Sequence, residues 1–357
     1  MEKEKQSKQW PVMIAILMAH ILLFAGFLGL TWRCALLGRT TGVVICAVLA
    51  LGALALCVLQ LRREGRTGRL LGLLDDLLLL AFLLPMGLSI FLYEENFWYH
   101  HETPGAAVQQ VSGYGGLRET PSPFRSDMDQ LLDGAFYSKE TPWREPVVIL
   151  VHGNGVGHRA YLDVINAMTA EGYLVYAYDA TGYDASEGNS AWGLPQGVLD
   201  LAYAIDHVRA QQPERPIALL GHSWGAYAAG AVLNVRPQVE AVVSLAGFDS
   251  SVELLEQQGR GLIGAPAALL APYLSLYEWI KFGAWADLTA SAGFAASTAR
   301  VLAVHSADDP IIPPGLGYDR YLSAFADDPR FTFRLYTDRG HERLFDGAEV
   351  NRFLSRG

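Results

Sequence analysis

Cysteine is scarce in this chain of 357 residues, and its three cysteines, Cys34, Cys46 and Cys57, all lie near the beginning. The rest of the chain can therefore form no disulfide bond, which excludes a fold that depends on disulfides and leaves no thiol there to be oxidised. This distribution is compatible with an oxidising compartment.

Positive charge is also scarce over most of the chain. Residues 94–357 contain 18 Lys and Arg against 32 Asp and Glu, a net charge of −14, whereas residues 1–93 have a net charge of +4. An acidic surface repels phosphate backbones, so the sequence argues against a nucleic-acid partner. The length allows about two domains, and the change in charge divides the chain near residue 93.

Long apolar runs are confined to the first part and cover residues 11–31, 41–61 and 77–93. About 20 residues at 1.5 Å each span a hydrocarbon core of about 30 Å, so we expect three transmembrane helices, with two as the alternative. A cleaved signal peptide fits the first run less well, because the run is long and no small-residue cleavage site follows it. We place Asp75 and Asp76 at the membrane edge, because a carboxylate in the bilayer centre costs about 2.5–3.5 kcal/mol.

Basic residues set the expected orientation of these helices. Three lysines precede the first run and four arginines lie between the second and third, whereas the first loop has only Arg33 and Arg39. Cytoplasmic loops carry the excess of Lys and Arg. Three spans then place everything after the third on the extracytoplasmic face, where Phe97, Trp98 and Tyr99 resemble an interfacial aromatic belt.

Strand and helix patterns alternate after a lead-in at 94–134, whose Gly, Pro, Ser and Thr content is typical of a juxtamembrane linker. Strands are predicted at 147–151, 173–179, 217–220, 241–245, 301–305 and 331–336, and helices at 161–171, 194–211, 224–233 and 318–326. This alternation predicts an α/β fold with a mostly parallel sheet and helices on both faces. Active sites of such sheets lie at the carboxyl ends of the strands.

One of these strand ends carries the pattern Gly221-His222-Ser223-Trp224-Gly225. This G-x-S-x-G pattern is typical of a nucleophile elbow, a strained turn that exposes a serine between a strand and a helix. Glycines are needed two residues before and after the serine, because bulkier side chains would collide across the turn. The pattern predicts that the Ser223 hydroxyl is the centre of the chemistry.

Three further strand ends carry polar turns. His152-Gly153-Asn154-Gly155 could aim backbone N–H groups at an oxyanion, Asp308 or Asp309 could orient an imidazole, and His341 could act as a general base. Each turn alone has a plain structural explanation. The chain order Ser, Asp, His is the order found in α/β-hydrolases.

From residue 135 to 357 the chain resembles the α/β-hydrolase superfamily, and within it the branch of serine esterases, monoglyceride lipases and serine aminopeptidases. The resemblance rests on the elbow around Ser223, the His152-Gly153 turn, the turn Asp309–Pro313 and Gly340-His341. It implies an α/β-hydrolase fold preceded by the transmembrane region 1–93, with a helical cap inserted at about 250–298.

The resemblance also implies a function, a membrane-anchored serine hydrolase that cleaves carboxylic esters through an acyl-enzyme. Ser223 would be the nucleophile, His341 the base and Asp309 the residue that orients it. The backbone amides of Asn154 and Trp224 would form the oxyanion hole. No cofactor and no metal is implied. His222 is interpreted as a packing residue rather than a base.

Two positions depart from the family pattern. The loop 179–188 is similar to D-x-x-G-x-G-x-S-x-G, but Asp184 replaces the usual glycine, which puts the shape of this loop in question. Ser306 stands where the acid turn usually has glycine, and counting three residues from it selects Asp309 over Asp308.

The substrate stays open at this stage. The apolar cap could line an acyl pocket, contact a bilayer or pack on the core, so the substrate is a small-molecule or lipid-like acyl compound. A peptidase and an acyltransferase with the same triad are alternatives. A non-catalytic interaction protein on a hydrolase scaffold is another, although no member of the triad is missing.

Overall fold

A computed structural model describes residues 14, 17–18, 20–29, 31–32, 40–60 and 77–356. The chain divides into two compact units. The anchor unit comprises residues 1–95 and 263–281, and the hydrolase unit comprises residues 96–262 and 282–357. Each unit has its own packing and is described by itself.

The hydrolase unit is built on an eight-stranded sheet with the order β1-β4-β6-β5-β7-β8-β9-β10. The strands from β6 to β10 run parallel to one another, whereas β1 and β4 pair antiparallel at one edge. The strands are β1 (Arg118–Pro121), β4 (Gly134–Ser138), β5 (Val147–Val151), β6 (Leu174–Tyr178), β7 (Ile217–His222), β8 (Ala241–Leu245), β9 (Arg300–Ser306) and β10 (Phe331–Tyr336). A separate two-stranded sheet pairs β2 (Phe124–Arg125) with β3 (Leu131–Leu132).

Helices cover the sheet because its central strands are apolar on both faces. Every residue of β5, β7 and β8 is buried, as expected for parallel strands between two helical layers. The helices of the hydrolase unit are α5 (Leu162–Ala170), α6 (Leu194–Gln211), α7 (Trp224–Ala231), α8 (Ser251–Ile263), α10 (Ala290–Ala296), α11 (Tyr318–Phe325) and α12 (Gly347–Leu354).

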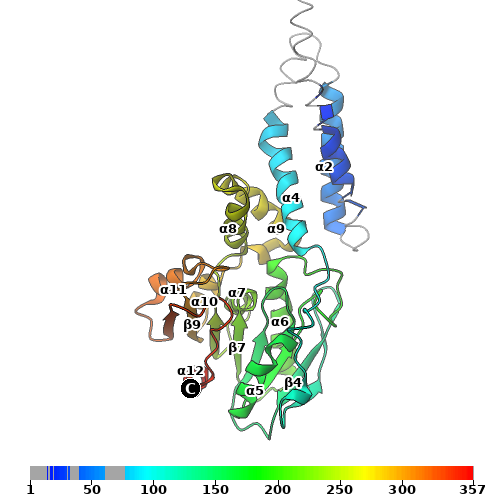
Figure 1. Ribbon diagram of the computed structural model, residues 1–357. Coiled ribbons are helices and arrows are strands. Elements are labelled where there is room, and N and C mark those ends of the chain that lie inside the picture. The colour runs from blue at the N-terminus through cyan, green and yellow to red at the C-terminus, as the bar shows by residue number, and fades with distance from the viewer. Residues whose placement is uncertain are drawn as a thin grey trace, which may run out of the picture. The chain divides into compact units, whose positions relative to one another are not determined.

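Alternate strand residues pack into separate layers. Val148 and Leu150 of β5 join one apolar cluster with side chains of α5 and α12, so Val147 and Ile149 point to the opposite face. Helices α6, α7 and α10 form another layer, in which α7 packs between its two neighbours at the glycines of α6 and α7. Strand β7 leads directly into α7 within this arrangement (Figure 1).

The predicted elements from residue 147 onward are confirmed, with boundaries that differ by at most two residues. The lead-in is different, because part of residues 94–134 is not a linker. It contributes β1, β2 and β3 and the first residue of β4. These strands have two to five residues, too few to show a period of two, and their flanking Pro and Ser residues mimic a linker. Pro121 is tolerated because β1 is an edge strand.

The expected cap at 250–298 is helical, as predicted, but it is shared between the two units. It contains α8, a 3₁₀ turn at Ala265–Leu269, α9 (Ala271–Phe282), a 3₁₀ turn at Gly283–Asp287 and α10. Residues 263–281 belong to the anchor unit and not to the hydrolase unit. Side-chain contacts between distant segments decide this division, so it could not be predicted from the position of the insertion.

The anchor unit contains helical residues 20–29, α2 (Thr40–Gln60), a π-helical turn at Leu79–Leu83, α4 (Leu84–Phe97) and α9. Gly87 of α4 lets the first of these helices approach, because a Cβ there would lie 3.2 Å from Leu23 and 3.4 Å from Phe27. Within the described ranges, none of the helices combines the length and apolar character needed to cross a membrane. The predicted spans 11–31 and 41–61 and the residues Asp75 and Asp76 lie partly or wholly outside those ranges.

A buried polar cluster joins α4 to α9 inside the anchor unit. The Glu94 carboxylate accepts hydrogen bonds from the Tyr277 hydroxyl at 2.8 Å and the Lys281 ammonium at 2.6 Å. The Tyr93 hydroxyl donates to Glu278 at 2.9 Å. The side chains of the Lys281–Glu94 ion pair are only 7% and 6% exposed. An ion pair this deeply buried leaves an uncompensated charge when one partner is removed.

We predict that Lys281→Met and Glu94→Gln each destabilise the chain by about 3–5 kcal/mol, because either change leaves one buried charge without its partner. The double variant should lose less than the sum of the two single losses, because it removes both charges. Thermal and urea denaturation of the full-length chain measure this. Additive losses would contradict a direct interaction between the two side chains.

Candidate active site

Ser223 occupies a strained turn between β7 and α7. Its backbone has φ 55° and ψ −114°, a conformation that costs a non-glycine residue of order 1–3 kcal/mol. A Cβ at Gly221 would lie 2.2 Å from the Gly225 carbonyl oxygen, and a Cβ at Gly225 would lie 2.1 Å from the Val151 carbonyl oxygen. The collision predicted for bulkier residues is therefore one between backbone segments. The Ser223 amide donates to the Leu245 carbonyl at 2.8 Å, which ties the turn to β8.

Asp309 and His341 meet after β9 and β10. The Asp309 Oδ2 atom lies 2.7 Å from His341 Nδ1, and Oδ1 accepts from the Ile311 and Ile312 amides at 2.9 Å each. Burial alone would raise the pKa of Asp309, but these hydrogen bonds, led by the one from His341, outweigh it and hold the pKa below its usual value. The carboxylate is therefore ionised at neutral pH and keeps the proton of the imidazole on Nδ1.

Asp308, the alternative candidate, contacts the backbone rather than the imidazole. Its Oδ1 accepts from the Ser306 hydroxyl at 2.5 Å and from the Gly340 amide at 2.9 Å. The Ser306 oxygen in turn accepts from the Arg339 amide at 3.1 Å. Asp308 and Ser306 thus hold the turn that carries His341, whereas Asp309 holds its ring. The hydroxyl at Ser306, where the family usually has glycine, has a specific use here.

The turn after β5 brings two backbone amides toward Ser223. The side-chain oxygen of Asn154 accepts from the Tyr183 hydroxyl at 2.5 Å, which fixes that residue. Trp224 is the first residue of α7, where an amide has no partner within its own helix. The amides of Asn154 and Trp224 belong to residues that line the same cavity as Ser223, which is the arrangement needed for an oxyanion hole.

This cavity, in the hydrolase unit, has a volume of about 820 Å³. Ser223 and His341 both line it, so the structure brings the predicted nucleophile and the predicted base to one space. Among the hydrogen bonds of the described residues, none joins the Ser223 hydroxyl to His341. Such contacts are often long without substrate and tighten when it binds. The apolar part of the wall comprises Phe97, Ala107, Val156, Val164, Leu194, Phe248, Leu254, Ile311 and Phe345.

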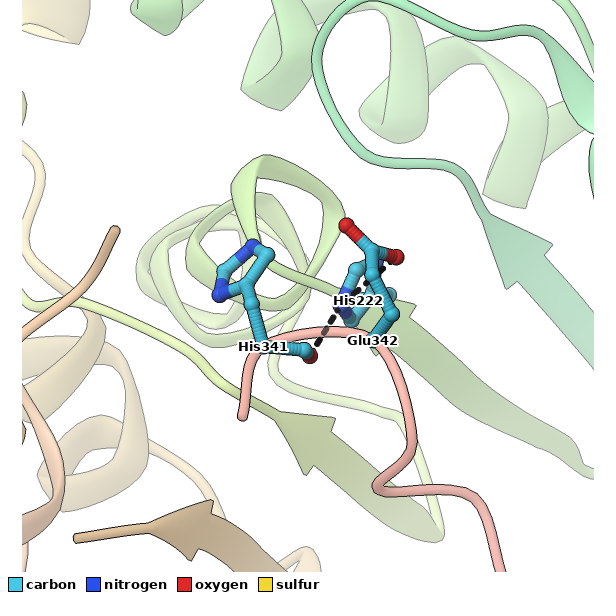
Figure 2. Close-up of side chains that lie close together, drawn as sticks. All are labelled: His222, His341 and Glu342. Atoms are coloured by element: carbon cyan, nitrogen blue, oxygen red, sulfur yellow. Dashed lines mark hydrogen bonds and ion pairs between the residues drawn. The ribbon is translucent and has the colours of Figure 1, made fainter. Parts of the chain in front are cut away.

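His222, His341 and Glu342 lie close enough for one atom of each to reach a common point. Figure 2 shows His222 directed toward the His341 backbone oxygen and the Glu342 carboxylate. Both ring nitrogens of His222 take part in hydrogen bonds, and Nδ1 of His341 contacts Asp309. Only one histidine nitrogen and one exposed carboxylate stay free of protein hydrogen bonds, fewer than the three protein ligands of a catalytic zinc site.

Comparisons with known proteins agree with this geometry. The family model described as serine aminopeptidase, S33 matches residues 144–278. An esterase from Pyrococcus furiosus superposes with a TM-score of 0.55 at 18% identity over 72% of this chain and 98% of the esterase. A second crystal form of that esterase gives a TM-score of 0.55 at 19% identity, over 71% and 98%. No curated protein sequence matches the chain.

The hydrolase unit has the α/β-hydrolase fold. Its site is that of a serine hydrolase. This likeness extends over nearly the whole of the esterase chain, so the family resemblance expected from residues 135–357 is confirmed at the level of the fold.

The loop 179–188 of this α/β-hydrolase shows why Asp184 can replace glycine. Asp184 has φ +41°, in the left-handed region that glycine adopts without penalty and that Asp tolerates better than most residues. Its carboxylate accepts from the Thr103 amide and the Thr103 hydroxyl, each at 2.6 Å. The same hydroxyl accepts from the Gly157 amide at 2.6 Å. The departure therefore adds contacts between this loop and the lead-in segment.

Two residues near the site were not singled out by the sequence analysis. Thr103 lay in the expected linker, and Tyr161 was read only as the start of a helix. Tyr161 accepts from the Gly153 amide at 3.0 Å and contacts His222 at 2.8 Å. A hydroxyl at such a position carries no sequence signal, because its partners are 8 and 61 residues away.

We predict that Asp184→Ala destabilises the hydrolase unit more than Asp184→Gly. Both variants lose the hydrogen bonds to Thr103, each worth about 1.5–3 kcal/mol for a charged acceptor. Only alanine keeps a Cβ at positive φ, which costs about 1 kcal/mol more. Thermal denaturation of the two variants beside wild type measures the order. Equal stability of Asp184→Ala and wild type would refute the role of this carboxylate.

Proposed function

We propose that this chain is a membrane-anchored serine hydrolase that cleaves carboxylic esters with apolar, lipid-like acyl groups. The observation that carries the proposal is the convergence of a strained elbow serine, Ser223, and an Asp309–His341 pair on one cavity. Strain at an exposed serine between a strand and a helix serves no packing purpose, and it is a hallmark of an activated nucleophile.

The reaction begins when the Ser223 hydroxyl oxygen attacks the ester carbonyl carbon and its proton passes to Nε2 of His341. The ionised Asp309 stabilises the imidazolium through Nδ1. The amides of Asn154 and Trp224 donate to the oxyanion of the tetrahedral intermediate. His341 then gives the proton to the leaving alcohol, which leaves an ester of Ser223 with the acyl group. Water, deprotonated by His341, releases the acid and regenerates the hydroxyl.

The cavity walls support an apolar acyl group. Leucine, phenylalanine, valine and isoleucine side chains make up most of the wall distant from the elbow, and a volume of about 820 Å³ accommodates a ligand of substantial size. Polar groups are concentrated where the reacting carbonyl would lie. The cavity therefore suits a long or branched acyl chain with a single polar reactive centre.

Membrane attachment is supported by the sequence and by the exposed side chains of the anchor unit. Apolar side chains of its described helices are directed outward, among them Met18, Leu22, Leu28, Val44, Val48, Leu51, Leu54, Leu77, Leu88 and Phe91. In the cap segment that belongs to this unit, Leu269, Leu276 and Trp279 are also exposed. Contiguous exposed apolar surface of this kind marks contact with a membrane or a partner. We propose that residues 1–93 anchor the chain and that the hydrolase unit lies on the extracytoplasmic face.

An aminopeptidase is the second candidate, because the matching family model carries that description. Asp163 and Glu342 both line the cavity, and the Glu342 side chain is 73% exposed. A carboxylate at the mouth of the site could bind the ammonium group of a peptide N-terminus. The apolar wall would then take the first side chain.

We expect a fluorophosphonate probe to label the wild-type chain and not the Ser223→Ala variant, because the probe reacts with an activated serine. Asp309→Asn should slow labelling by about a thousandfold or more, because the imidazole loses the acceptor that sets its tautomer. Asp308→Asn should have a smaller effect, because Asp308 contacts only the turn. In-gel fluorescence measures all four. Equal labelling of wild type and Ser223→Ala would refute the proposal.

The same labelling tests the orientation. A membrane-impermeant probe should label intact cells as fully as it labels lysates if the hydrolase unit lies outside. Labelling of lysates alone would place the unit on the cytoplasmic side and leave the chemistry unaffected.

Substrate class is tested with matched chromogenic compounds. We expect p-nitrophenyl esters of medium-length fatty acids to be hydrolysed with a higher kcat/KM than p-nitroanilides of leucine or alanine, because the cavity wall is apolar. Initial rates of wild type, with Ser223→Ala as the blank, measure this. A preference for the aminoacyl anilides would establish the second candidate instead.

A further inference from the structure

His222, next to the nucleophile, lies in a continuous chain of hydrogen bonds that runs between three turns of the site. Its Nε2 atom lies 3.0 Å from the His341 backbone oxygen, and its Nδ1 atom lies 2.8 Å from the Tyr161 hydroxyl. That hydroxyl accepts from the Gly153 amide at 3.0 Å. The chain therefore connects the turn after β5, the nucleophile elbow and the turn that carries the proposed catalytic base.

The chemistry of the partners determines where each proton lies. A backbone carbonyl can only accept, so Nε2 of His222 carries a proton and donates to His341. The neutral ring then has a lone pair on Nδ1, which accepts from the Tyr161 hydroxyl. The Tyr161 oxygen still accepts from the Gly153 amide. Every polar atom in this chain thus has a partner of the correct kind.

Burial favours this neutral arrangement. It lowers the pKa of His222, and the neighbouring His341 lowers it further. Burial also raises the pKa of Tyr161, whose hydroxyl therefore stays protonated. With both ring nitrogens hydrogen-bonded, His222 is not available as a general base.

Packing adds to the hydrogen bonds. The rings of His222 and His341 lie 4.9 Å apart between centroids at 51°, so His222 contacts both the backbone and the ring of the residue that must reach Ser223. A Cβ at Gly153 would lie 3.0 Å from the Tyr161 hydroxyl and 3.2 Å from His222 Nδ1, which shows how closely the three turns approach. The sequence interpretation of His222 as a packing residue is therefore incomplete.

We infer that His222 and Tyr161 are positioning residues, which set the placement of His341 and of the Gly153–Asn154 turn relative to Ser223. The inference rests on the proposed function, since it assigns these residues a part in the same reaction. Neither side chain exchanges a proton with the substrate. A displacement of reacting groups by about 1 Å can cost about a hundredfold in rate, so the loss of this chain of hydrogen bonds should reduce kcat.

Tyr161→Phe and His222→Phe test this directly. We expect kcat for a p-nitrophenyl ester to fall tenfold to a hundredfold with less than a threefold change in KM. The rate of fluorophosphonate labelling should fall in parallel. Rates are expressed per active site by titration with the same probe, so that a smaller folded fraction is not read as a lower kcat. Tyr173→Phe, which removes a hydroxyl bonded to Asn351 away from the site, is the matched control with wild-type kcat.

Two conservative variants separate positioning from mere packing. The amide nitrogen of His222→Gln lies where Nε2 was and can still donate to the His341 carbonyl, whereas the amide of His222→Asn lies near the position of Nδ1 and cannot reach that carbonyl. We expect Gln to restore most of kcat and Asn to restore less than a third as much. If the phenylalanine variants do not fold, this pair decides the question.

Wild-type kcat in both phenylalanine variants, or equal kcat in the Gln and Asn variants, would overturn the inference. Ser223→Ala, assayed in parallel, keeps this outcome separate from a failure of the proposed function. Activity that survives Ser223→Ala would refute the hydrolase mechanism itself. Loss of activity in Ser223→Ala together with unaffected Tyr161 and His222 variants would refute only the positioning role.

Discussion

The site depends on one close approach of backbones around Ser223. Gly225 lies against the carbonyl of Val151 at the end of β5, and Gly221 lies against Gly225 across the turn. These contacts leave no room for a Cβ, and they force Ser223 into a conformation that β-strand and helix residues do not adopt. The surrounding parallel strands are buried on both faces and hold this geometry in place, because a packed sheet deforms little.

Polar contacts between strand ends convert that constraint into an arrangement of side chains. Four turns follow β5, β7, β9 and β10, and none of them is regular structure. Asp308 holds the turn of His341 through the backbone, Asp309 holds its ring, and His222 contacts it from the elbow. Each of these groups is hydrogen-bonded, which is expected of buried polar atoms. The catalytic geometry is thus a property of the contacts between turns and not of any single turn.

The cap and the N-terminal helices show a second kind of dependence. Helix α9 belongs with α4 because Glu94, Tyr277 and Lys281 satisfy one another away from water. An insertion within the hydrolase sequence is therefore part of the anchor unit. For an enzyme proposed to act on lipid-like esters, this means that the anchor and part of the cap form one body, and that an isolated fragment 96–357 would lack the partners of its own α9.

Local pattern alone determined much of this protein. Apolar runs and Gly-rich turns were enough to predict β5, β8 and β10, the elbow at Ser223 and the order of the Ser, Asp and His turns, because these signals lie within a few consecutive residues. Only the tertiary structure decided that Asp309 contacts the His341 ring and Asp308 its turn, that β1 and β4 complete the sheet, and that Tyr161 reaches His222. Those features depend on which distant segments come within hydrogen-bond distance, and a hydroxyl or carboxylate looks the same in sequence whether or not it finds such a partner.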